Sequence, residues 1–187
     1  MSTVSPPSSG STPDQRDPFE LFMGPHEAIR KALATMRTLA AADPDALPTP
    51  DIRAMAEQLL DCYDKVVLPH HREEEREFWP MVAHARNHSE DQATFVQTAR
   101  RLQDEHAELE ARWASLQDAL RSLASGRAAP LATAALTELA AKYSRHAQFE
   151  DELLVPLARH LLSPTEQSRL AVSVLLSRLP VGKWGMV

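Results

Sequence analysis

Cysteine is nearly absent from this chain of 187 residues, in which Cys62 stands alone. A single cysteine excludes an internal disulfide and any metal site built from several thiolates. The chain also has only five glycines and two tyrosines. Such scarcity, together with abundant alanine, leucine, glutamate and arginine, favours helices over strands. We therefore predict an all-α fold.

The chain also lacks a basic patch and a long apolar run. Lys and Arg number 20 against 26 Asp and Glu, and the formal net charge of −6 argues against a nucleic-acid-binding surface. No apolar segment approaches the ~18 residues that a membrane-spanning helix needs. The first residues do not have the basic and then apolar pattern of a secretory signal. We expect a soluble cytoplasmic protein with neither a nucleic-acid nor a membrane partner.

Caps and prolines divide the chain into helices. Residues 1–16 are rich in Ser, Pro and Thr and predict a disordered N-terminal tail, and residues 181–187 predict a C-terminal tail. Between them we expect one domain over residues 17–180. Asp17 and Ser163 are predicted N-caps, each followed by a proline at the first helical position. Signals of this kind place four long helices and one short C-terminal helix at about residues 17–42, 49–85, 89–125, 130–160 and 163–179. Four long helices with short connections predict an up-down-up-down four-helix bundle.

The second of these helices contains two internal prolines. Pro69 and Pro80 cannot donate a backbone hydrogen bond, so we expect a kink at Pro69 and a loosened turn near Pro80. The helix that follows should begin at Ser89, with Gln92 three residues later as the second half of a capping box.

One motif occurs twice: His70-x3-Glu74-x5-Pro80 and His146-x3-Glu150-x5-Pro156. On a helix, a histidine and a glutamate four residues apart point from the same face, one turn apart. Imidazole and carboxylate form a mixed nitrogen and oxygen ligand set that suits iron, manganese or zinc. The repeat therefore indicates two halves of one metal site.

The apolar stripe of each long helix includes one histidine, and two stripes also include a glutamate. The residues placed inward in this way are His26, His70, Glu74, His106, His146 and Glu150. A single inward histidine is more often a hydrogen-bonded core residue than a ligand. Two inward glutamates are different, because an unpaired buried carboxylate costs several kcal/mol. A metal site is favoured over a metal-free polar network.

The number and type of these side chains narrow the choice of metal. They are too many for one tetrahedral zinc ion, and calcium and magnesium prefer oxygen ligands alone. Shared between two ions, with both carboxylates bridging, they give each ion about four protein donors and leave open positions. We expect two iron ions, for which manganese or zinc can substitute. Ferritin-like bundles differ, since their motif has glutamate first and a spacing of three.

The pattern resembles the hemerythrin-like family, also called the HHE cation-binding domain. The segments that carry the resemblance are Gly-Pro-His26-Glu-Ala-Ile-Arg30, His70-His71-Arg-Glu-Glu74-Glu-Arg-Glu-Phe-Trp-Pro80, Asp-Glu-His106-Ala-Glu-Leu and His146-Ala-Gln-Phe-Glu150-Asp-Glu-Leu-Leu-Val-Pro156. The resemblance covers about residues 17–160. It implies a non-haem di-iron centre in a four-helix bundle, in which the four histidines are terminal ligands and Glu74 and Glu150 bridge the irons.

The chain departs from the oxygen-carrying members, which have five histidines and a His-x3-His pair on the third helix. Leu102 precedes His106 by four residues, and Glu110 follows it by four. The six-ligand set therefore resembles more closely the bacterial members linked to nitric oxide response and repair of iron centres. Glu110 is a possible seventh ligand, although a solvent-facing role is favoured.

Neighbouring residues leave two alternative assignments open. His71 and Glu75 have the same spacing as His70 and Glu74, but only His70 has a proline ten residues later, as His146 does. We therefore choose His70 and Glu74. Asp151 is a weaker alternative to Glu150 as a bridge.

These residues predict a protein that binds or senses dioxygen or nitric oxide at a di-iron centre. A small diatomic or peroxide is the expected ligand, and the redox or signalling partner is unknown. The alternatives are a di-iron redox enzyme, acting on peroxide or nitric oxide or in iron-centre repair, and iron storage. We expect Phe22, Ile29, Phe78, Leu109 and Trp113 to form the dry wall of the ligand pocket.

Overall fold

The computed structural model describes residues 17–42, 48–85 and 90–177, and within these residues it contains helices and no strand. Its elements, including three π-helical turns named η, are α1 (Pro18–Ala40), α2 (Pro50–Cys62), η1 (Tyr63–Val67), α3 (Leu68–Glu73), η2 (Glu74–Phe78), α4 (Trp79–Ala83), α5 (Glu90–Ala124), α6 (Thr133–Phe149), η3 (Glu150–Leu154), α7 (Val155–Leu161) and α8 (Pro164–Ser177). The all-α prediction is confirmed. The two predicted tails lie outside the described residues.

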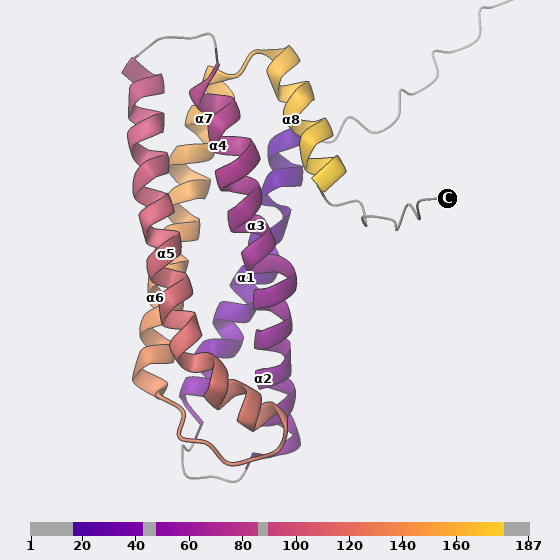
Figure 1. Cartoon of the computed structure of the whole chain (residues 1–187), viewed down its shortest axis with the longest axis vertical. Coiled ribbons are helices and arrows are strands. Elements are labelled where there is room, and N and C mark those ends of the chain that lie inside the picture. Colours follow the sequence, from indigo (N-terminus) through magenta and orange to yellow (C-terminus); the bar gives the residue numbers. More distant parts are fainter. Residues whose placement is uncertain (1–16, 43–47, 86–89, 178–187) are drawn as a thin grey trace, which may run out of the picture.

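The long helices form an elongated bundle, and α8 lies beside it at one end (Figure 1). Around the bundle, α1 packs against α2 and α6, and α5 packs against the same two helices. The segments α2–α4 and α6–α7 each continue through π-helical turns as one long rod (Figure 1). The short helix α8 packs on α1 and on η2.

Two of the predicted caps are formed by the residues that the sequence indicated. The side chain of Asp17 accepts a hydrogen bond from the Phe19 backbone N–H at 2.9 Å. Ser163 and Glu166 form a capping box, in which the Ser163 N–H donates to Glu166 Oε2 at 2.9 Å and the Glu166 N–H donates to Ser163 Oγ at 3.4 Å. The predicted cap Ser89 lies outside the described residues.

Each π-helical turn precedes a proline by the same interval. The N–H groups of Leu68, Trp79 and Val155 donate to carbonyls five residues earlier, at Tyr63, Glu74 and Glu150. The next residue in each case is a proline, Pro69, Pro80 or Pro156. Because proline has no N–H for the carbonyl four residues earlier, a wider turn accommodates it within a continuous helix. The expected kink at Pro69 and loosened turn near Pro80 are therefore π turns.

A polar layer divides the buried interior into two apolar clusters. On α1, Phe22 belongs to one cluster and Ile29 to the other, and the buried His26 lies between them. On α5, His106 lies in the same way between Leu102 and Leu109. Candidate site residues thus occupy the middle of the bundle. The five residues expected to line a dry pocket are all buried in these clusters.

Gly126 follows α5 and ends this helix in a left-handed backbone conformation. Its φ of 75° is in the left-handed region, which costs a residue with a Cβ about 1–2 kcal/mol. We expect Gly126→Ala to lower the free energy of unfolding by ~1 kcal/mol in denaturant titration. Gly24→Ala, at an exposed position within α1 where the backbone is right-handed, should lower it by less than this. Equal effects of the two substitutions would contradict this assignment.

Candidate metal centre

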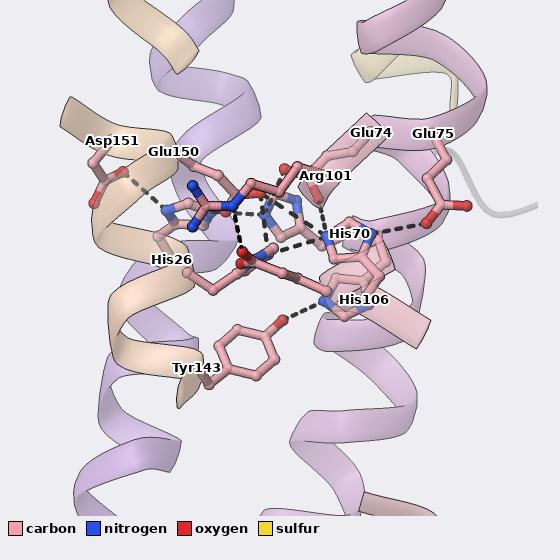
Figure 2. A network of polar contacts seen from close by, with 12 residues as sticks. His26, His70, Glu74, Glu75, Arg101, His106, Tyr143, Glu150 and Asp151 are labelled. Atoms are coloured by element: carbon pink, nitrogen blue, oxygen red, sulfur yellow. Dashed lines mark hydrogen bonds and ion pairs between the residues drawn. The ribbon is translucent and has the colours of Figure 1, made fainter. Parts of the chain in front are cut away.

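All the residues that the sequence placed inward lie in the polar layer and are buried (Figure 2). They come from α1, α3, η2, α5, α6 and η3, so four rods of the bundle contribute. Together with His71, these residues place their candidate ligand atoms in two adjacent clusters. Within each cluster, all the ligand atoms lie within 4.8 Å of one another. The first cluster contains His26, His70, Glu74 and Glu150, and the second contains His71, His106 and His146.

The two glutamates lie between the clusters. Glu74 places Oε1 3.6 Å from His70 Nε2 in the first cluster and Oε2 3.3 Å from His106 Nε2 in the second. Glu150 places Oε2 3.5 Å from His26 Nε2 and Oε1 3.2 Å from His146 Nε2. Each carboxylate therefore faces one imidazole of each cluster, an arrangement that suits a bridging ligand.

His71 is the residue that the sequence reasoning missed. His70 and His71 were treated as alternatives, but both are buried, with exposed fractions of 3% and 1%. Successive helical residues point about 100° apart, and the site is wide enough that each imidazole enters a different cluster. Leu102, at the position where oxygen-carrying members have a histidine, lies in an apolar cluster. The fifth imidazole comes instead from α3, and the doublet His70-His71 was its signal.

Four outer carboxylates hold the histidines from behind. Hydrogen bonds join Nδ1 of a histidine to a carboxylate in the pairs His26–Asp151 (2.9 Å), His71–Glu110 (3.0 Å), His106–Glu75 (2.8 Å) and His146–Glu105 (3.2 Å). Because a carboxylate accepts, each Nδ1 carries the proton and each Nε2 lone pair points inward. This is the tautomer that a metal ligand of this type requires.

These contacts assign roles to the acidic residues whose part in the site the sequence did not decide. Asp151 and Glu75 support histidines of other helices and do not point into the clusters as bridges. Glu110 is neither a ligand nor simply solvent-facing, because it accepts from His71. Glu75 directly follows Glu74 and Asp151 directly follows Glu150, so the motif extends to His-x3-Glu followed by an acidic residue. That shared position was a signal for the outer support.

Two observations show that the donors fit a cation. Both carboxylate oxygens of Glu74, and Oε1 of Glu150, are buried with no hydrogen-bond partner among the described residues. The Nε2 atoms of His26 and His70 face each other at 2.7 Å, and those of His106 and His146 at 3.1 Å. Two nitrogens bound at right angles to one ion at ~2.1 Å lie about 3 Å apart. Lone pairs and carboxylates directed at the same space are favourable with positive charge between them.

Burial also sets the protonation of the site. It raises the pKa of Glu74 well above its ordinary range, and the neighbouring Glu150 carboxylate raises it further. Burial lowers the pKa of His106, as do the adjacent imidazoles of His71 and His146, so His106 is a neutral donor. At His146 burial lowers the pKa, but the carboxylates of Glu150 and Glu105 together outweigh it and the net shift is upward.

Comparison with known proteins places these residues in a family. The family model described as the hemerythrin HHE cation-binding domain matches residues 17–158, which include every candidate ligand and its outer carboxylate. Comparisons with curated proteins and with solved structures found no match. In the part of the chain that the structure describes, no helix is long and apolar enough to cross a membrane. The matched range ends before α8 begins.

The raised pKa of Glu74 predicts a pH dependence of the metal-free protein. Above the ordinary carboxyl pKa of 4.5, the folded protein keeps a proton that the unfolded chain releases, so stability falls as pH rises. We expect Glu74→Gln, which removes this penalty, to melt at a higher temperature than the original chain at pH ~7 and at a similar one at pH ~4. The measurement is the melting temperature after chelation of metals.

A matched control is Glu57→Gln, at an exposed position of α2. It should leave the melting temperature close to that of the original chain at both pH values. A difference between Glu74→Gln and the original chain that does not change with pH would contradict the assignment.

Proposed function

Because the chain belongs to the hemerythrin HHE cation-binding domain family, we propose that its polar layer holds two iron ions and binds dioxygen or nitric oxide. The observation that supports this most strongly is the convergence of five buried imidazoles and two buried carboxylates on the same part of the core. Imidazole and carboxylate together suit ferrous and ferric iron. Iron bound there would supply an electron-rich position for a small diatomic ligand.

The two clusters provide unequal numbers of donors. Both can use Glu74 and Glu150, but the first has two imidazoles and the second has three. The position beside His26 and His70 therefore has fewer protein ligands and more room for an external one. The Phe22 ring packs against His70 with centroids 5.4 Å apart, and Phe78 packs against Phe22 at 4.2 Å. These rings provide an apolar contact on one side of His70.

The fifth imidazole weakens the sequence argument against reversible oxygen binding. With Leu102 in place of a histidine, the six-ligand set resembled the members linked to nitric oxide response and repair more than the oxygen carriers. His71 restores the number of imidazoles that oxygen-carrying hemerythrins have, although from a different helix. That count supports reversible binding as the first candidate.

Tyr143 supports the enzyme alternative, peroxide or nitric oxide turnover. Its hydroxyl lies 2.5 Å from His71 Nε2. The phenol is buried, and burial raises its pKa well above the ordinary value, so it remains a neutral hydrogen-bond donor. When His71 Nε2 is used as a ligand, this hydroxyl is released as a donor beside the site. A donor here can stabilise a bound oxygen ligand or deliver a proton to it.

Metal content tests the centre itself. After anaerobic loading with ferrous iron we expect two irons per chain, and about one after His71→Ala, which removes an imidazole from the second cluster. His84→Ala, which alters an exposed histidine, should keep both irons. Absence of iron from the loaded original chain would refute the proposal. Two tightly held irons in His71→Ala would show that His71 is not a ligand.

The absorption spectrum during oxygen cycling separates binding from turnover. We expect a reversible adduct, and Tyr143→Phe should speed ligand dissociation about tenfold because one hydrogen bond of roughly 1.4 kcal/mol is lost. Tyr63→Phe is the matched control, since the buried Tyr63 hydroxyl has no hydrogen-bond partner among the described residues. Rapid oxidation of the centre with consumption of peroxide would instead favour the enzyme.

A further inference from the structure

Two of the outer carboxylates are themselves bound by arginines. Asp151 accepts from His26 Nδ1 at 2.9 Å through Oδ1 and from Arg30 Nη2 at 2.6 Å through Oδ2. Asp151 is thus held between two residues of α1 that are one helical turn apart. The same carboxylate therefore serves a buried imidazole with one oxygen and a surface guanidinium with the other.

A second set of histidine, carboxylate and arginine is joined in the same order on α5 and α6. Glu105 accepts from His146 Nδ1 at 3.2 Å through Oε2 and from Arg101 Nε at 2.9 Å through Oε1. Arg101 and Glu105 are both on α5, whereas His146 is on α6. We call these two sets, His26–Asp151–Arg30 and His146–Glu105–Arg101, the arginine relays. One relay ends in each cluster of the candidate centre.

Exposure increases steadily along each relay. The histidine side chains are 1–2% exposed, Asp151 and Glu105 are 28% and 30% exposed, and Arg30 and Arg101 are 57% and 64% exposed. The outer member of each relay is therefore in contact with solvent while the inner member is dry. The strength of an ion pair at such a depth depends on dissolved salt.

Surface cavities give solvent ions access to both relays. A cavity of about 320 Å³ is lined by Arg101, Glu105 and His146, and one of about 270 Å³ is lined by Arg30 and Asp151. The Arg101 guanidinium also lies 4.8 Å from the centre of the Phe149 ring, which holds it over the first of these cavities.

We propose that Arg30 and Arg101 are positioning residues that slow the loss of metal from the centre and make this loss sensitive to ionic strength. The inference rests on the proposed function, because it assumes that the centre holds metal. An arginine fixes the orientation of its carboxylate, the carboxylate fixes the imidazole, and the imidazole then keeps Nε2 directed at the ion. Loss of the carboxylate that holds a ligating histidine typically weakens metal affinity 10–100-fold, and an exposed ion pair to that carboxylate accounts for up to about fivefold.

The other two supports provide an internal comparison. Glu75 and Glu110 hold His106 and His71, but neither has a hydrogen bond from an arginine among the described residues. Each cluster thus has an arginine relay at one histidine. The salt-sensitive part of metal release is assigned to His26 and His146.

The test measures how fast a chelator removes metal from the loaded chain at ~0.01 M and ~1 M salt, where the screening length falls from ~30 Å to ~3 Å. We expect release from the original chain to be several-fold faster at high salt. Arg101→Gln and Arg30→Gln should each release metal roughly two- to fivefold faster at low salt and show less dependence on salt. Arg101→Lys, which keeps the charge, should restore part of the difference.

The matched control is Arg112→Gln. Arg112 is also on α5 and is paired with Glu108 and Glu138, neither of which is bonded to a histidine of the centre. It should leave release unchanged. If Arg101→Gln and Arg30→Gln behave like Arg112→Gln, or if they keep the full salt dependence, the proposal is overturned.

Two measurements keep the outcomes distinct. Metal content before the chelator is added reports on the proposed function, because a chain that never loads metal refutes the centre and not only the relays. The melting temperature of the metal-free variants reports on folding. Faster release with an unchanged melting temperature supports the relays, and faster release in proportion to lost stability, independent of salt, overturns them.

Discussion

Burial of Glu74 and Glu150 in the middle of an apolar bundle is the constraint on which the other features of the site depend. A carboxylate with oxygens that lack partners costs several kcal/mol in such a place unless it is protonated or faces positive charge. Burial disfavours the charged form of His106, so this imidazole does not supply that charge. Five imidazoles and two carboxylates around the same space are therefore best understood as a site prepared for metal.

The prolines of the repeated motif have a structural role that is separate from ligation. Glu74 and Glu150 each begin a π turn and lie six residues before a proline. Tyr63 does the same ahead of Pro69, yet it contributes no ligand to either cluster. The wide turns therefore accompany the missing N–H of these three prolines, whereas α1 contains Pro25 without a π turn. At two of the three places the chain also uses the turn to present a carboxylate to the core.

The polar layer depends on partners that lie outside the clusters. Four imidazoles are each oriented by a carboxylate that lies on another rod than the imidazole itself. These contacts therefore tie the rods together at the level of the site. Mutual orientation of this kind prepares the lone pairs before any ion arrives. It also connects the buried centre with surface charges at Arg30 and Arg101.

The sequence by itself determined the helices, the family and the inward histidines and glutamates, because caps, prolines and stripes act over a few residues. Only the tertiary structure decided that His71 enters the second cluster, and that Asp151, Glu75, Glu105 and Glu110 stand behind the ligands. Helical spacing gives the face on which a side chain lies. It does not give the neighbour across the bundle, because that neighbour depends on the distance and rotation between helices far apart in sequence.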